Sequence, residues 1–101
     1  MSREVVFRLA AHAELKEAKV WYEEQREGLG AEYVLSVEET IERISKNPEL
    51  YAIVQEDVRQ TLVRRFPYVI YYRYENDENE RIVVLAVFHA SRDPENWKSR
   101  Y

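Results

Sequence analysis

The sequence has no cysteine, only two glycines and three prolines, and no long apolar run. The lack of cysteine excludes a disulfide scaffold, a thiolate metal site and a cysteine nucleophile. Two glycines are too few for a glycine-rich phosphate loop or a dinucleotide-binding turn. The only histidines, His12 and His89, are too few for a dedicated zinc site. We therefore expect neither a metal nor a cofactor.

What the sequence does contain is typical of one small globular domain. It has 101 residues, of which 46% are hydrophobic. A chain of this length can bury roughly two-thirds of the surface that its unfolded form exposes, so it can form a core without cross-links. No stretch is long enough to span a bilayer, and no signal peptide opens the chain. We expect a single domain over residues 1–101, located in the cytoplasm and without membrane contact.

The net charge of −4 is distributed unevenly. Residues 1–55 hold seven basic and eleven acidic side chains, whereas residues 56–101 hold eight of each. An acidic first half argues against binding nucleic acid through bulk charge. It leaves room for a local anion-binding site in the second half.

The hydrophobic periodicity predicts two helices between strands. Residues 4–9 are rich in β-branched and aromatic side chains, which favours a strand. Amphipathic patterns then predict helices over 11–25 and 30–46, separated by a turn that uses both glycines. Asn47 and Pro48 end the second helix, because the residue before proline avoids helical geometry.

The remainder of the chain reads as strands and a short tail. Strands are expected over 58–65, 68–74 and 82–88, and the last of these is apolar on both faces. Pro94 opens a short terminal helix. The order β-α-α-β-β-β predicts an α+β domain with a helical hairpin on one face of a mainly antiparallel, four-stranded sheet.

A basic cluster is the main candidate for chemistry. His89 ends the last strand, where strict alternation places it on the face of Val83, Leu85 and Val87, and Arg92 follows three residues later. Arginines at positions 59, 65 and 73 lie on neighbouring strands. Guanidinium and imidazole groups gathered on one face would suit phosphate or carboxylate recognition and proton transfer. The alternative is that surface arginines protect sheet edges and that His89 is a packed strand-end residue.

The aromatic residues also allow two interpretations. Trp21, Tyr22 and Tyr33 on the two helices fit helix packing or a partner-binding surface. Trp97 fits an anchor that packs the tail onto the domain. His12 fits a solvated position at the start of the first helix.

Several fragments together resemble the RelE/ParE superfamily of toxin–antitoxin toxins, of the ParE-like, plasmid-stabilisation type. The fragments are Ala18-x-x-Trp21-Tyr22, Gly28-Leu29-Gly30, Asn47-Pro48-Glu49-x-Tyr51, Arg59, Phe66-Pro67-Tyr68-x-Ile70-x-Tyr72 and Ala86-Val87-x-His89-x-x-Arg92-x-Pro94-x-x-Trp97. They cover nearly the whole chain in the order of that family. The element order read from the periodicity agrees with the family's fold.

The resemblance implies a bacterial, growth-inhibiting toxin encoded beside an antitoxin that neutralises it. Such antitoxins wrap around the toxin, so the resemblance suggests Trp21, Tyr22 and Tyr33 as antitoxin-binding residues. It also suggests a free strand edge as a docking site. Operator DNA would be bound only through the antitoxin. One branch of the superfamily cuts mRNA on the ribosome, and another poisons DNA gyrase.

The sequence departs from the ribonuclease branch at two positions. That branch has a catalytic arginine where Tyr68 stands and a tyrosine near Trp97, and an indole has no hydroxyl for acid–base work. Together with the acidic balance, this favours inhibition of DNA gyrase by binding, with Arg59, Arg64, Arg73 and Trp97 as target-binding candidates. The alternative is a ribosome-dependent mRNA endoribonuclease with Arg65, His89 and Arg92 as catalytic candidates. A second alternative is a degenerate, non-toxic binding module.

Overall fold

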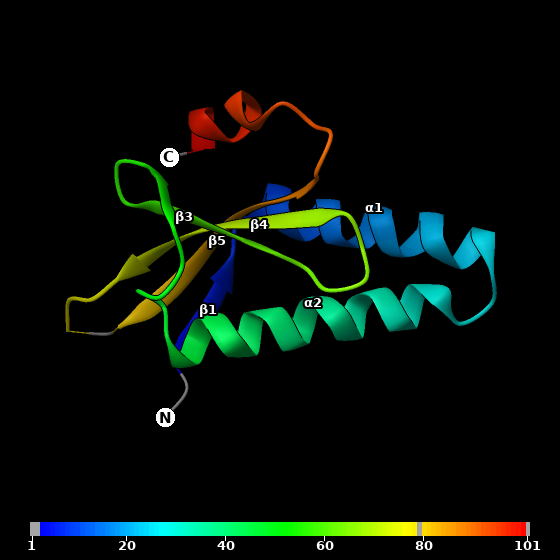
Figure 1. Ribbon diagram of the computed structural model, residues 1–101, viewed down its shortest axis with the longest axis horizontal. Helices are drawn as coiled ribbons and strands as arrows, with labels where there is room; N and C mark the ends of the chain where they lie inside the picture. Colours follow the sequence, from blue (N-terminus) through cyan, green and yellow to red (C-terminus); the bar gives the residue numbers. More distant parts are fainter. Residues whose placement is uncertain (1–2, 79, 101) are drawn as a thin grey trace.

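The structure is a computed structural model that describes residues 3–78 and 80–100 (Figure 1). The described chain forms two helices, five strands and a terminal 3₁₀-helix. In chain order these are β1 (Glu4–Phe7), α1 (Leu9–Gln25), α2 (Leu29–Lys46), β2 (Ile53–Gln55), β3 (Val58–Leu62), β4 (Tyr68–Glu75), β5 (Arg81–His89) and η1 (Pro94–Arg100). Asn79, expected in the turn before β5, lies outside the described residues.

The strands form one mixed sheet in the order β1-β5-β4-β3-β2. β1 runs parallel to β5, and the other neighbouring strands are antiparallel. This confirms an α+β fold with a mainly antiparallel sheet, but the sheet has five strands and not four. The additional strand, β2, has three exposed residues and therefore left no periodic signal in the sequence.

The turn between the helices is held by one carboxylate. Gly28 has a φ of 87°, in the left-handed region that glycine adopts without strain. Glu23 of α1 accepts hydrogen bonds from the backbone N–H groups of Gly28 and Gly30, at 2.9 and 3.0 Å. These two bonds lower the pKa of Glu23. The carboxylate thus caps the start of α2 and fixes it to α1.

The centre of the sheet, formed by β4 and β5, is buried on both faces. The helical hairpin covers one face, where Tyr22 and Tyr33 pack with Ile70 and Tyr72 of β4. On the other face, η1 crosses the sheet and Trp97 packs on Tyr71, with ring centroids 5.3 Å apart. Figure 1 shows this tail, in red, on the opposite side of the sheet from α2. Burial on both sides explains why β5 is apolar at nearly every position.

A bulge in β5 changes which residues share a face. Tyr71 pairs with Ala86 and Tyr72 with Val84, so Leu85 is an extra residue. As a result Val87 faces the helices, whereas Val83 and Leu85 face the tail. The expectation that His89 shares a face with Val83 and Leu85 is therefore wrong. In the described residues, no helix has the length and apolar character needed to cross a membrane.

Candidate functional site

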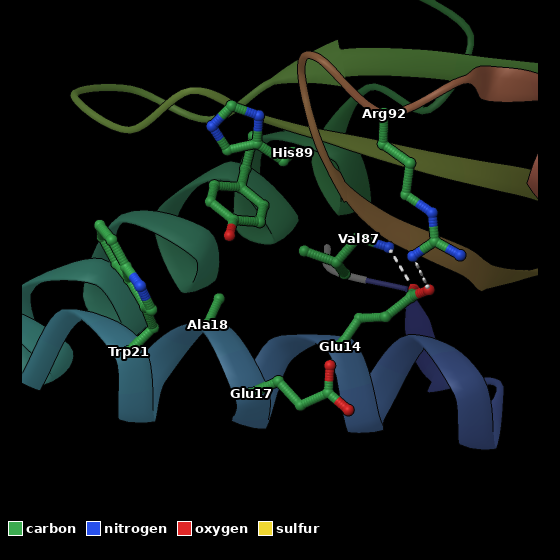
Figure 2. Close-up of a pocket in the computed structure, with 8 residues that line it drawn as sticks. Glu14, Glu17, Ala18, Trp21, Val87, His89 and Arg92 are labelled. Atoms are coloured by element: carbon green, nitrogen blue, oxygen red, sulfur yellow. Dashed lines mark hydrogen bonds and ion pairs between the residues drawn. The ribbon is translucent and has the colours of Figure 1, made fainter.

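A groove lies between α1 and the end of β5, and two of the predicted residues meet there. Its volume is about 280 Å³. It is lined by Glu14, Glu17, Ala18, Trp21, Tyr68, Val87, His89 and Arg92. Figure 2 shows the α1 residues Glu14, Glu17 and Trp21 along one wall, with His89 and Arg92 opposite. His89 and Arg92 are thus brought together, as the sequence predicted.

Glu14 organises one end of the groove. Its carboxylate accepts hydrogen bonds from the Val87 backbone N–H at 3.1 Å, from Arg92 at 3.0 Å and from Arg100 at 2.8 and 3.0 Å. The side chain is only 12% exposed. β1 ends at Phe7, opposite Val84, so on that side β5 lacks a strand partner beyond this point. Glu14 and Arg100, which also donates to the Leu85 carbonyl at 3.1 Å, supply the missing partners.

His89 sits at the other side of the groove and stacks edge-on against Tyr68, with ring centroids 5.3 Å apart. Its Nδ1 accepts a hydrogen bond from the Ser91 backbone N–H at 3.1 Å and lies 2.8 Å from the Ser91 hydroxyl. Because Nδ1 is the acceptor, the neutral ring carries its proton on Nε2. In this arrangement Nδ1 is already occupied by Ser91, and Nε2 of the neutral ring is a hydrogen-bond donor.

Glu17 and Trp21 form the exposed wall of the groove, one helical turn apart. The Trp21 indole is 55% exposed and meets Tyr22 edge-on, with centroids 5.1 Å apart. Within the described residues, the exposed Glu17 carboxylate has no hydrogen-bond or ion-pair partner. The groove therefore holds two carboxylates against one guanidinium. Since Arg92 and Arg100 already pair with Glu14, the unpaired Glu17 carboxylate favours an apolar or cationic group over a phosphate.

Three tyrosines lie at the base of the groove: Tyr22 and Tyr33 are buried, and Tyr68, which lines the groove, is half-buried. Burial raises the pKa of Tyr22, Tyr33 and Tyr68. Tyr33 is fully buried and Tyr22 is 9% exposed. Of the three residues suggested for antitoxin binding, only Trp21 presents its side chain to a partner, because Tyr22 and Tyr33 are used in the core.

The predicted arginines do not converge on the groove. Arg65 pairs with Glu32 of α2 at 2.9 Å, and hydrogen bonds from Arg26 and Arg65 lower the pKa of Glu32. Arg59 donates to the carbonyls of Glu49 and Tyr51, at 3.1 and 2.6 Å, and so fixes the loop before β2.

Three further candidates, Arg64, Arg73 and Trp97, also lie away from the groove. Arg64 is exposed and follows the end of β3. Arg73 pairs with Asp57 at 3.3 Å and lies opposite Val83, on the tail side of the sheet. Trp97 is 2% exposed on that same side. It serves as the tail anchor, and its burial leaves no indole surface for a target. The candidate residues are therefore spread over both faces of the sheet.

Sequence reasoning missed the two acidic members of the groove, Glu14 and Glu17. The available signal was their spacing: Glu14 and Ala18, and Glu17 and Trp21, are each four residues apart on a helix and so share a face. Among residues 3–78 and 80–100 there is no group of three or more potential metal ligands from histidine, cysteine, aspartate and glutamate.

Comparison with known protein families shows which family the chain belongs to. Residues 5–94 match the family described as the ParE toxin of the type II toxin–antitoxin system, parDE. The chain belongs to this ParE toxin family. A chain in a solved structure described as the chromosomal ParDE TA system from P. aeruginosa has the same fold, with a TM-score of 0.75. At 15% identity, the alignment covers 89% of this chain and 98% of that chain. No curated protein matches the sequence significantly.

Proposed function

We propose that this ParE-family toxin inhibits growth in the cytoplasm by binding and disabling DNA gyrase, and that a cognate antitoxin neutralises it. The observation that carries the proposal is the electrostatic character of the groove. Arg92 and Arg100 are both bound by Glu14, while Glu17 has no basic partner among the described residues. A groove whose arginines are already paired offers no free cation to a phosphodiester, and it accommodates a protein surface.

The positions expected to be catalytic in the ribonuclease branch further support binding over cleavage. Tyr68 is packed against His89 and Tyr33, and burial raises the pKa of its hydroxyl. Trp97 lies on the opposite face of the sheet from His89 and is buried. An acid–base pair needs both groups within reach of the same proton. Trp97 is therefore out of reach of His89, and the raised pKa of Tyr68 makes its hydroxyl a weaker acid.

The exposed indole of Trp21 supports a protein partner on the groove side. A large aromatic side chain that remains half exposed beside apolar Ala18 and Val87 is typical of interface residues. We infer that this wall of the groove receives the antitoxin. The resemblance to a ParDE system in the solved structure is consistent with such a pair.

The test is a supercoiling assay with purified toxin and DNA gyrase. We expect loss of supercoiling and accumulation of a trapped cleavage complex, both reversed by the product of the neighbouring antitoxin gene. Normal supercoiling at a large excess of toxin, together with codon-dependent cuts in mRNA after induced expression, would reject gyrase and establish the ribonuclease alternative.

A matched pair of histidine variants separates the two activities in cells. His89→Ala removes the only imidazole of the groove, whereas His12→Ala changes an exposed histidine on α1 outside it. If the toxin acts by binding, both variants remain toxic. A selective loss of toxicity in His89→Ala, with unchanged circular dichroism, contradicts the proposal. Normal growth with soluble wild-type toxin would instead indicate the degenerate binding module.

A further inference from the structure

The outer edge of the sheet has an unpaired stretch of backbone at the end of β3. Gln60 donates its N–H to the Ala52 carbonyl at 3.1 Å, on the β2 side. Val63 donates its N–H to Tyr68 at 2.9 Å, on the β4 side. Because successive residues of a strand point their backbone groups to opposite sides, Leu62 directs its N–H and C=O away from β4. Within the described residues these two groups have no partner.

The side chains around this edge are apolar or neutral. Leu62 is 66% exposed, and Ile53 and Val54 of the neighbouring β2 are also exposed. A hollow of about 300 Å³ lies beside them, lined by Ala52, Gln60, Thr61, Leu62 and Val69. Residues 52–55 and 60–63 carry no charge, although 34% of the chain is charged. Free sheet edges are usually protected by charged side chains, so this neutral edge is unusual.

We propose that this edge joins two copies of the chain, with the β3 strands paired antiparallel about a twofold axis at Leu62. In such a pair, two opposite residues exchange both of their backbone hydrogen bonds. Leu62 has both groups open, so it satisfies this geometry with its own copy. The absence of charge at this edge also favours a second copy of the chain as the partner. A twofold axis places Leu62 opposite itself, where any charge would repel its equivalent.

The register fixes the contacts. The two copies of Leu62 lie on the tail side of the sheet, since Leu62 pairs with Val69 within its own chain. Their Cα atoms are about 5.5 Å apart in a hydrogen-bonded antiparallel pair. Their side chains meet over the hollow and bury its apolar lining. Gln60 is displaced by roughly 14 Å along the strand from its equivalent.

Cross-linking tests the register directly, because the chain has no cysteine of its own. Leu62→Cys brings two thiols together with a Cα separation of about 5.5 Å, within the range of a disulfide. We expect this variant to form a disulfide-linked dimer under mild oxidation. Gln60→Cys, on the same strand and also exposed, is the control and stays monomeric. Equal cross-linking of both variants, or of neither, overturns the proposed pairing.

Sedimentation tests the association without a cross-link. Over a concentration series from about 1 µM to about 1 mM, which covers weak interfaces, the wild-type mass rises from 12.2 kDa to twice that value and no further. Leu62→Lys places two cations at the axis and remains monomeric. Leu35→Lys makes the same change at an exposed leucine of α2 and keeps the dimer.

The other possible results of the sedimentation experiment contradict the proposed dimer interface. A wild-type protein that stays monomeric throughout, or grows beyond two copies, overturns the twofold dimer. Dissociation by Leu35→Lys as well as by Leu62→Lys shows that β3 is not the interface. Leu62 is absent from the groove lining, so the dimer proposal and the gyrase proposal are tested independently of each other.

Discussion

Two buried tyrosines differ in one hydrogen bond. Tyr72 donates its hydroxyl to the Pro48 carbonyl at 2.7 Å, and burial raises its pKa to about 12. The Tyr33 hydroxyl is equally buried but has no hydrogen-bond partner among the described residues. A buried polar group without a partner loses its hydration and gains nothing in return.

This contrast predicts opposite effects of the same substitution. Tyr72→Phe orphans the Pro48 carbonyl and lowers the free energy of unfolding by about 1–2 kcal/mol. Tyr33→Phe removes an unsatisfied hydroxyl and leaves stability unchanged or raises it by up to about 1 kcal/mol. Urea titration of both variants measures the difference. A loss in Tyr33→Phe as large as that in Tyr72→Phe would show that the Tyr33 hydroxyl has a partner.

At the level of single residues, sequence reasoning identified part of the site. The proximity of His89 and Arg92 follows from their closeness in sequence at a strand end, so it was predictable. The side-chain directions of Arg59, Arg65 and Arg73 depend on their bonding partners. These are loop carbonyls for Arg59, Glu32 for Arg65 and Asp57 for Arg73. Strand parity contains no information about such partners.

At the level of elements, the close approach of the two helices depends on Gly30. A Cβ atom at this position would lie 2.7 Å from the Lys19 carbonyl oxygen of α1 and 2.9 Å from the Glu23 carboxylate. Lys19 contributes a backbone atom, which cannot move aside as a flexible side chain can. Gly30 is therefore a position where the backbones of α1 and α2 approach closely.

Gly30→Ala tests this contact against helix propensity. Alanine favours a helix over glycine by about 1 kcal/mol, but overpacking costs typically about 1–3 kcal/mol. Since a backbone atom blocks the Cβ, we expect the overpacking to dominate and the melting temperature to fall. Gly28→Ala is the comparison, because its Cβ would meet no atom within 4 Å and only the positive φ opposes it. A Gly30→Ala variant more stable than the wild type would contradict the close packing.

The boundaries of the helices and long strands agree with the sequence pattern to within about three residues, but the bulge in β5 was not predictable. Every residue from Ile82 to Phe88 is apolar. A register shift is visible in sequence only when it interrupts an alternation of polar and apolar residues. β5 has no alternation, so nothing marked Leu85 as the extra residue.

At the level of the whole molecule, the tail completes the domain. The hairpin covers one face of the sheet, and η1 provides the cover for part of the other through Trp97. Arg100 of η1 also binds Glu14 of α1, so the tail connects the two layers. The two tryptophans thus have different roles: Trp97 holds the fold together, and Trp21 faces outward from it.

Alanine substitution of each tryptophan separates stability from recognition. Trp97→Ala leaves a large cavity against Tyr71 and lowers the free energy of unfolding by about 3–5 kcal/mol, a large fraction of what a small domain has. Trp21→Ala changes stability by less than about 1 kcal/mol, because its indole is 55% exposed. Chemical unfolding checks both values, and Trp97→Phe provides a folded variant if alanine is not tolerated.

Calorimetric titration with the antitoxin then tests recognition: Trp21→Ala loses affinity at unchanged stability, whereas Trp97→Phe binds normally. Equal stability of the two alanine variants would mean that the tail does not pack on the sheet.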